Sequence, residues 1–345
     1  MKALKVFPIA IVLTILGLNY STVNGQQKQA INIAFYNMEN LFDTIDTPNK
    51  IDEEYLPSAK TNWNTEKYTN KLANMSASIL AINNGKGPDV LGMCEIETEI
   101  ALKDLCKQLA KSGQVYNYVF FEGQDERGID VALIYKTALF KVSNKHSYII
   151  DPATIGGDHT RNILYAQLQA KKGTPLNLLV NHFPSRREGQ MESEYKRIAV
   201  AAKLKNITDS ITKINNNAAV IMMGDFNDHP NDKSMSETIS GKLKIDEVGN
   251  SDFYNPFWKL HLDGLGSHKY KGEWGVLDQI LINSNLTKNK TGFVYSSNSA
   301  KIIKNDFLLE TEERFKGNPK RTFAGSKYLN GYSDHLPVSI DLLLE

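Results

Sequence analysis

Cysteine is scarce in this sequence of 345 residues, in which Cys94 and Cys106 are the only two. Their spacing matches no common zinc motif, and two cysteines cannot build a disulfide-rich scaffold. Cys94 ends an expected buried strand, and Cys106 lies in the helix expected after it. We therefore expect both to be small core residues, although an exported protein would permit a disulfide between them.

A strong charge of one sign is also absent, because 40 basic residues stand against 39 acidic residues and give a net charge of +1. This excludes a polycationic chain that bulk charge alone would draw to nucleic acid or to a membrane surface. The hydrophobic content of 41% is typical of a globular protein. No repeat, low-complexity tract or Pro/Ser-rich linker divides the chain, so we expect one domain.

The apolar run near the N-terminus, residues 6–18, is too short for a membrane-spanning helix, which needs about 20 residues. Lys2 and Lys5 precede this run, and a polar stretch ending in small residues leads to Gln26. We therefore expect a secretory signal peptide at 1–25 and a mature protein of 26–345, exported to a periplasm or the medium. The segment around the cleavage site contains no cysteine that could carry a lipid anchor. Stable membrane insertion is therefore not expected after cleavage.

Short apolar runs alternate with segments of helical periodicity along the rest of the chain. The runs predict strands at 31–36, 89–94, 118–121, 131–135, 146–150, 163–169, 176–180, 218–223, 276–282 and 336–344. The periodicity predicts helices at 65–82, 97–111 and 192–214. Several central strands follow one another without room for a helix, which favours antiparallel pairing. We expect mixed sheets, packed face to face, with helices outside.

Polar side chains gather at the ends of these strands. The clusters are Asn37 with Glu39, Glu95 with Glu97, Asn181 with His182, Asp225 with Asn227, Asp278 with Gln279, and Asp334 with His335. One such pair alone is ordinary turn chemistry, but Asp278 interrupts an apolar run, where a carboxylate is costly unless paired or metal-bound. Together, these carboxylates, amides and imidazoles favour a hard cation, Mg²⁺, with Mn²⁺ or Ca²⁺ as alternatives, over zinc.

The motifs resemble the endonuclease/exonuclease/phosphatase superfamily in residue type and order. They are Asn37, Glu95, Asn181-His182, Gly224-Asp225-Phe226-Asn227, Asp278 and Ser333-Asp334-His335. The resemblance runs from Ile31 to the C-terminus. It implies an α/β fold, a four-layer sandwich of two mixed β-sheets flanked by helices, with the active site at one rim.

The resemblance also implies roles for the matching residues. Glu95 corresponds to the principal metal ligand of the family, and Asn37 and Asp334 would complete or support the metal site. These three residues form the predicted metal set.

The catalytic roles implied by the resemblance fall on five residues. Asp225 and Asn227 would orient or deprotonate the attacking water and hold a phosphate oxygen. His335 would bind the scissile phosphate, held by Asp278 as its carboxylate partner, or would act as the base. His182 would protonate the leaving oxygen or stabilise its developing charge.

Further residues near these motifs have a functional and a structural interpretation. Asp130 could orient His182, and Arg161 and Arg186 could contact phosphate, for which arginine is well suited. For Arg187 a solvated loop is an equal interpretation. Glu39 and Glu97 could be outer carboxylates of the metal site or solvated loop acids. Trp63, Trp258 and Trp274 could stack on bases or be buried aromatics.

Three functional hypotheses follow. The first is a secreted phosphodiesterase that uses a divalent metal to hydrolyse nucleic acid, with water as nucleophile. The second keeps this chemistry but acts on a phospholipid head-group or another small phosphoester. The third, a non-catalytic binding protein on the same fold, is disfavoured because Glu95 and His335 are both present. No protein partner is indicated.

Overall fold

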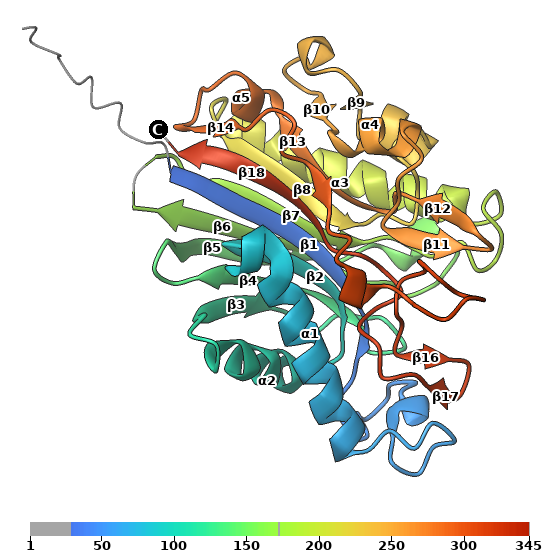
Figure 1. The fold of residues 1–345 in the computed structure, drawn as a ribbon. Helices are drawn as coiled ribbons and strands as arrows, with labels where there is room; N and C mark the ends of the chain where they lie inside the picture. Colours follow the sequence, from blue (N-terminus) through green and yellow to red (C-terminus); the bar gives the residue numbers. More distant parts are fainter. Residues whose placement is uncertain (1–28, 172, 345) are drawn as a thin grey trace, which may run out of the picture.

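The computed structural model describes residues 29–171 and 173–344, so the predicted signal peptide lies outside the described residues. Two large mixed β-sheets lie face to face, each of seven strands, and helices cover their outer faces (Figure 1). This confirms the expected single α/β domain with four layers. None of the described helices is long and apolar enough to cross a membrane.

The first sheet has the strand order β14-β18-β1-β2-β4-β3, and β15 also pairs with β18. Its strands are β1 (Gln29–Leu41), β2 (Val90–Ile96), β3 (Tyr116–Phe120), β4 (Asp130–Lys136), β14 (Phe293–Tyr295), β15 (Lys301–Ile302) and β18 (Val338–Leu344). Only β1 and β2 run parallel among these pairs. The two central strands therefore deliver their carboxyl ends to the same edge of the sheet.

The second sheet has the strand order β5-β6-β7-β8-β13-β10-β9. Its strands are β5 (Phe140–Tyr148), β6 (Ile163–Ala170), β7 (Leu176–His182), β8 (Ala219–Asp225), β9 (Gly241–Lys242), β10 (Phe253–Tyr254) and β13 (Asp278–Asn283). The strands β5, β6 and β7 pair antiparallel, as predicted from their short connections. The strands β7 and β8 pair in parallel, and a long helix connects them along the chain.

Three long helices form the outer layers: α1 (Thr65–Gly85) and α2 (Glu99–Ala110) on the first sheet, and α3 (Glu194–Ile214) on the second. The first two begin at side-chain caps, because Asn64 and Thr98 accept hydrogen bonds from the backbone of the first turn. Shorter elements are α4 (Phe257–Leu262), α5 (Ser284–Thr287), the hairpin β11 (His268–Tyr270) with β12 (Glu273–Gly275), and the hairpin β16 (Phe323–Ala324) with β17 (Lys327–Tyr328).

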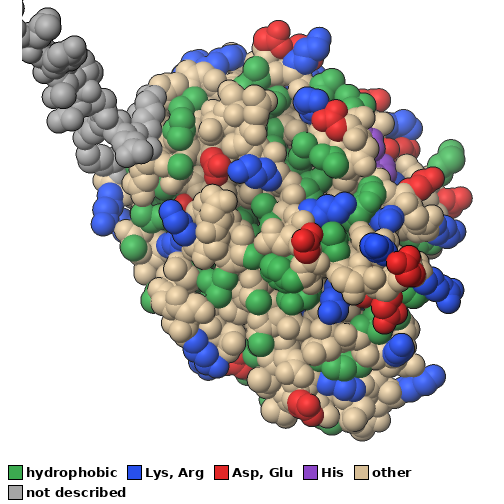
Figure 2. All heavy atoms as spheres, viewed as in Figure 1, with side chains coloured by type: hydrophobic (Ala, Val, Ile, Leu, Met, Phe, Trp, Pro, Cys, Tyr) green, Lys and Arg blue, Asp and Glu red, His purple; other side chains and the backbone are tan. Residues whose placement is uncertain are grey.

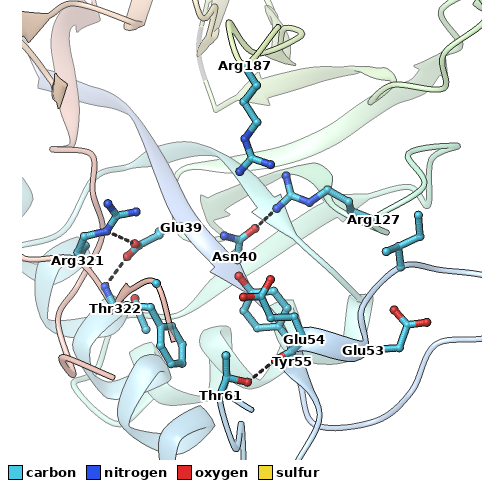
Figure 3. A pocket seen from close by; sticks show the side chains of 13 residues that line it. Glu39, Asn40, Glu53, Glu54, Tyr55, Thr61, Arg127, Arg187, Arg321 and Thr322 are labelled. Carbon is cyan, nitrogen blue, oxygen red and sulfur yellow. Dashed lines mark hydrogen bonds and ion pairs between the residues drawn. The ribbon is translucent and has the colours of Figure 1, made fainter. Parts of the chain in front are cut away.

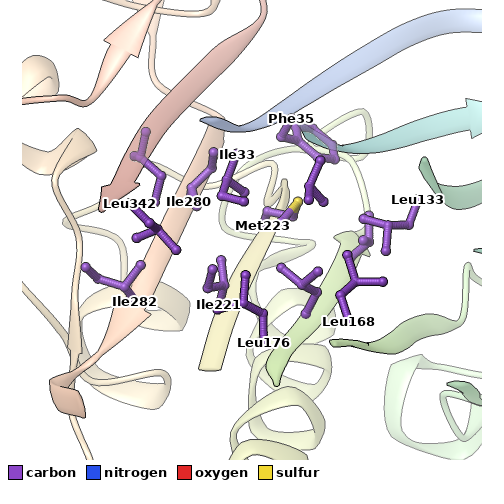
Figure 4. Packing of buried hydrophobic residues seen from close by; sticks show 14 of the residues in the cluster. Ile33, Phe35, Leu133, Leu168, Leu176, Ile221, Met223, Ile280, Ile282 and Leu342 are labelled. Carbon is purple, nitrogen blue, oxygen red and sulfur yellow. The ribbon is translucent and has the colours of Figure 1, made fainter. Parts of the chain in front are cut away.

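The largest apolar core lies between the two sheets. In Figure 4, Ile33 and Phe35 of β1 meet Met223 of β8, and Ile280 of β13 lies beside them; all four are fully buried. Burial of each such side chain contributes about 1.5–3 kcal/mol relative to exposure. The sandwich therefore holds the strand ends of both sheets in fixed relative positions.

Both cysteines are free, with Cys94 buried and Cys106 partly buried. This agrees with the expectation of small core residues. Trp63 is fully buried and donates its indole N–H to the carbonyl of Phe42, so its role is structural. Trp258 and Trp274 are partly exposed.

Candidate active site

Three neighbouring strands of the second sheet bring polar side chains to one level of the sheet. The strand β7 ends with His182, β8 ends with Asp225, and β13 begins with Asp278. Asp225 pairs in register with His182 on one side and with Asp278 on the other. Because β13 runs antiparallel to β8, its start lies at the edge where β7 and β8 end.

Gly224 allows β7 and β8 to pack at this edge. A Cβ atom at this position would lie 2.4 Å from the carbonyl oxygen of Asn181. The side-chain amide of Asn181 donates to the carbonyl oxygens of Leu179 and Met223, at 3.2 Å each. Glycine in the Gly-Asp-Phe-Asn motif is thus explained by strand packing, and Asn181 fixes the same junction.

The first sheet contributes Asn37 and Glu95. Asn37 on β1 pairs in register with Cys94 on β2, immediately before Glu95. The Nδ2 of Asn37 donates to Glu95 Oε1 at 3.2 Å and to Asp225 Oδ2 at 3.1 Å. One amide therefore joins carboxylates from the two sheets.

The backbone leaves regular strand geometry where these side chains project. The register between β2 and β4 shifts between Cys94 and Ile96, and Glu95 has a φ of 62°. Asn40 and Asn227, also near the cluster, have φ values of 60° and 50°. Left-handed conformations of non-glycine residues are costly and concentrate at functional sites, and a bulge re-aims a side chain. The strain at Glu95 accords with a functional position.

His182 lies near two carboxylates, Glu95 on the other sheet and Asp225 on the neighbouring strand of its own sheet. Its Nε2 lies 3.9 Å from Glu95 Oε1 and 3.8 Å from Asp225 Oδ2. Burial, followed by the positive charges of Arg161 and Arg127, lowers the pKa of His182 well below its usual range. Its Nδ1 is buried and has no hydrogen-bond partner among the described residues. The imidazole is therefore neutral at neutral pH.

His335 is protonated, in contrast to His182. Its Nδ1 lies 2.7 Å from Asp278 Oδ2, which also accepts a 2.6 Å hydrogen bond from the hydroxyl of Ser267. Burial lowers the pKa of His335, but the carboxylates of Asp278 and Asp225 outweigh it and hold the pKa well above its usual range. Its Nε2 lies 3.9 Å from Asp225 Oδ2. The result is an imidazolium with its Nε2–H towards the cluster.

These six residues form what we call the strand-end cluster: Asn37, Glu95, His182, Asp225, Asp278 and His335. Burial raises the pKa of Asp225 to about 7, although the charge of His335 opposes this shift. Asp278 is fully buried, and its Oδ1 has no hydrogen-bond partner among the described residues. The cluster is thus rich in carboxylates that lack full compensation by positive charge.

Asp334 lies beside this cluster rather than in direct contact with Asn37. The Oδ2 of Asp334 accepts a hydrogen bond from Arg321 at 3.1 Å. The neighbouring Ser333 contacts Asn37 instead, because its hydroxyl donates to the Asn37 carbonyl at 2.8 Å. Asp334, His335 and His268 have potential ligand atoms within 4.8 Å of one another. The predicted metal set therefore splits into a contacting pair, Asn37 and Glu95, and a neighbouring carboxylate.

Asn227 lies at the end of the motif that begins with Gly224. Its backbone N–H donates to Asp225 Oδ1 at 2.9 Å, and its side-chain amide donates to the carbonyl of Phe183 at 3.0 Å. Asn227 therefore fixes the carboxylate of Asp225 and adjoins the chain just after His182.

The structure places Asp130 away from its suggested partner. Its carboxylate accepts from the backbone N–H of Gly123 at 2.8 Å, while His182 Nδ1 has no hydrogen-bond partner among the described residues. Burial raises the pKa of Asp130 to about 7. The expected orienting contact with His182 is thus missing, because the carboxylate caps the loop before β4.

The two arginines expected at phosphate are engaged within the protein. Arg186 pairs with Asp228 and Asp232, at 2.9 and 2.5 Å. Arg161 donates to Asp125 at 3.1 Å and to the carbonyl of Phe183 at 2.6 Å. Arg161 lies close to His182, because it binds the carbonyl of the next residue, Phe183. The Arg186 guanidinium is instead held by Asp228 and Asp232.

A cavity of about 490 Å³ adjoins the cluster, and we call it the arginine cavity. Its lining residues are Glu39, Asn40, Ile51, Glu53, Glu54, Tyr55, Thr61, Arg127, Arg187, Arg321, Thr322, Phe323 and Gly325 (Figure 3). The backbone N–H of Asn40 donates to Glu95 Oε2 at 2.9 Å, which connects the cavity to the cluster. Among these lining residues, the sequence patterns pointed to Glu39 and Arg187.

The donor set fits a divalent cation. Carboxylate and amide oxygens are hard ligands, and Glu95 Oε1 and Asp225 Oδ2 lie close together because both accept from the Nδ2 of Asn37. A cation would also compensate the buried carboxylates whose pKa is raised, such as Asp225. Glu95 and Asn37, with Asp225 facing them, would hold it.

Comparison with known proteins places these features in a family. Residues 32–343 match the model of the Endonuclease/Exonuclease/phosphatase family. No curated protein sequence matches the chain.

Solved structures share the fold at low identity. A mannosyl-6-phosphatase from Bacteroides thetaiotaomicron is 14% identical, with 90% of this chain and 99% of that chain covered and a TM-score of 0.55. A humanised TDP2 from D. rerio is 17% identical, with 91% and 98% covered and a TM-score of 0.54. The human Nocturnin catalytic domain, with a bound sulfate anion, is 18% identical, with 92% and 95% covered and a TM-score of 0.52.

The match extends over nearly the whole described chain, and the strand-end cluster occupies one edge of the sandwich. The chain belongs to the endonuclease/exonuclease/phosphatase family and is a metal-dependent phosphoric ester hydrolase.

Proposed function

We propose that the protein is a nuclease that hydrolyses phosphodiester bonds of DNA or RNA with a divalent cation, Mg²⁺ in the first instance. The observation that carries this proposal is the placement of a neutral and a protonated histidine around Asp225, at 3.8 and 3.9 Å. Cleavage of a phosphodiester needs an anion-binding group and a separate group at the leaving oxygen. His335 and His182 supply these two groups.

Each side chain has a defined task in the proposed reaction. The imidazolium of His335 binds a non-bridging oxygen of the phosphate through Nε2–H, and Asp278 keeps it protonated. Asp225, whose Oδ2 lies within 4 Å of both histidine Nε2 atoms, accepts the proton of the attacking water as the new P–O bond forms. Asn227 holds the Asp225 carboxylate in position. When bound, the cation neutralises charge on the phosphate.

The neutral state of His182 selects between its two expected roles. Because its pKa is lowered well below the usual range, His182 stabilises the departing oxygen by a hydrogen bond rather than by full proton donation. The leaving oxygen then takes its proton from solvent as the other P–O bond breaks.

Plasmid cleavage tests this proposal. The protein 26–345 is incubated with supercoiled DNA, and in parallel with single-stranded RNA, in Mg²⁺, Mn²⁺, Ca²⁺ or EDTA, beside His335→Ala. We expect metal-dependent cleavage that EDTA and the substitution abolish. Intact DNA and RNA with every cation would reject the nuclease proposal.

A second candidate, hydrolysis of a small phosphoester or phospholipid head-group, has its own support. The arginine cavity carries Glu53 and Glu54 on one wall, which suit hydroxyl or amino groups better than a run of phosphates. Figure 2 also shows basic and acidic side chains interspersed over the viewed face, without a basic stripe. Phosphate or head-group release from sugar phosphates or lipid vesicles, with intact nucleic acid, would favour this candidate.

We also propose that the chain is exported, on the basis of its N-terminal lysines and the short apolar run that follows them. Expression of the full chain in a bacterial host, followed by N-terminal sequencing of the periplasmic or extracellular fraction, tests this. We expect a start at or near Gln26, and recovery of uncleaved protein from the cytoplasm alone would contradict export.

A further inference from the structure

Two arginines from different loops line the arginine cavity. Arg127 precedes β4, and Arg187 follows β7. In Figure 3 their guanidinium groups point toward each other over Asn40. Like charges that converge in this way repel each other, and an anion between them would relieve this repulsion.

The two guanidinium groups also keep donors free for a ligand. Arg127 donates through one terminal nitrogen to Asn40 Oδ1, and its other donors have no partner among the described residues. Arg187 is exposed and forms no hydrogen bond or ion pair within the described part of the chain. Arg321, the third arginine of the cavity, differs because it is paired with Glu39 and Asp334, at 3.3 and 3.1 Å.

Asn40 connects this pair of arginines to the strand-end cluster. Its Oδ1 accepts from Arg127, and its backbone N–H donates to Glu95 Oε2 at 2.9 Å. A ligand group between Arg127 and Arg187 would therefore lie one residue away from the carboxylate expected to hold the cation. That separation suits two groups of one substrate rather than two separate ligands.

We propose that Arg127 and Arg187 form a subsite for a second phosphate of the substrate, beside the phosphate that is cleaved. This proposal rests on the proposed function, because it assigns the cluster to the scissile phosphate. Arginine binds phosphate oxygens in a bidentate manner, and two guanidinium groups facing one another match the charge of a phosphate. The subsite has two possible sources of its phosphate: the next phosphodiester of a nucleic acid strand, or the second phosphate of a small bisphosphorylated molecule.

Matched substrates test the subsite and distinguish the sources. One pair is thymidylyl-thymidine with and without a 5′-phosphate, and the other is fructose 1,6-bisphosphate and fructose 6-phosphate. We expect Arg187→Ala to lower kcat/KM for the two-phosphate member at least tenfold more than for its one-phosphate partner, mainly through KM. Arg127→Ala should act in the same direction. Arg314→Ala, which removes an exposed arginine outside the cavity, is the control and should leave both ratios unchanged.

The pair of substrates that responds identifies the source of the second phosphate. Equal effects of Arg187→Ala on the two members of each pair would overturn the subsite, even if the enzyme is active.

A binding measurement covers the case in which the wild type cleaves none of these substrates. Calorimetric titration with inorganic pyrophosphate in Mg²⁺ should then show binding that weakens at least tenfold in the double variant Arg127→Ala/Arg187→Ala and is retained in Arg314→Ala. Unchanged pyrophosphate affinity would reject the subsite, whereas failure of all substrates bears on the proposed function. Circular dichroism and thermal unfolding confirm that each variant is folded.

Discussion

The strand-end cluster and the wall of the arginine cavity lie side by side but are built in different ways. The side chains of the cluster project from strand ends fixed by register, and Asp278 and Asp225 are 0% and 2% exposed. Most of the cavity wall comes from loops and short elements, and the Arg321 side chain there is 49% exposed. A rigid scaffold suits chemistry that needs fixed distances, whereas loops suit the selection of a substrate.

This difference predicts where substitutions abolish turnover and where they change selectivity. Changes in the cluster should affect every phosphoester alike, because each substrate must present one phosphate to it. Changes in the wall should affect substrates unequally. We expect the largest losses of activity from substitutions in the cluster and the smallest from substitutions in the wall.

Glu95→Gln should lower kcat/KM by roughly 100- to 1000-fold or more for all substrates, because it removes a ligand charge from the cation site. The melting temperature should change little, since Gln keeps the size of the side chain. Steady-state kinetics and calorimetric titration with Mn²⁺ measure both effects. Glu99→Gln is the matched control, because Glu99 is exposed at the start of α2. Wild-type turnover in Glu95→Gln would remove this residue from the metal site.

Asp278→Asn should lower activity by about 10- to 100-fold at neutral pH and change its pH dependence. The Asp278 carboxylate raises the pKa of His335, so its loss moves that pKa down toward the ordinary value of about 6.5. The protonated fraction of His335, and with it kcat/KM, then falls as pH rises through this range, earlier than in the wild type. Asp263→Asn, at an exposed position, should leave the profile unchanged. An unshifted alkaline limb would contradict the assigned role of Asp278.

Lys71→Met should weaken the junction between the two regions. Lys71 is a buried residue of α1 whose amine donates to Thr322 Oγ1 at 2.7 Å and to the Tyr332 carbonyl at 2.6 Å. Loss of these bonds should lower the free energy of unfolding by about 1–3 kcal/mol, measured by urea denaturation. Activity should fall only a few-fold, because the register of the cluster remains. Lys107→Met on the exposed face of α2 should have almost no effect on stability.

Glu54→Gln should have the smallest effect, a change of about two- to threefold in KM, because an exposed charge contributes little. The sign should depend on substrate: KM falls for nucleic acid as repulsion decreases, and rises for a small phosphoester that donates hydrogen bonds to this wall. The melting temperature should not change. The same shift for every substrate would break the division between cluster and wall.

The cluster could be predicted from sequence because strand ends obey simple rules. Apolar runs revealed most strands, and polar residues directly after them had to lie at sheet edges. Asp278 was visible as a carboxylate within an apolar run. The pairing of Asp278 with His335, expected from the family resemblance, is present at 2.7 Å.

The less regular parts could not be predicted in this way. The strand β5, Phe140–Tyr148, was expected only at 146–150, because it is an edge strand with exposed polar residues that give no apolar run. Arg186 was favoured over Arg187 by its proximity in sequence to His182, but Asp228 and Asp232 hold it. Loop direction depends on such tertiary pairs, and local pattern does not reveal them.

An anomalous-difference map from crystals of the protein grown with Mn²⁺ would show whether the strand-end cluster is the catalytic metal centre. We expect a peak within about 2–2.6 Å of the Glu95 carboxylate, with Asn37 adjacent and loss of the peak in Glu95→Gln. A Mn²⁺ peak elsewhere, in crystals of protein whose activity requires Mn²⁺, would show that the cluster is not the metal centre.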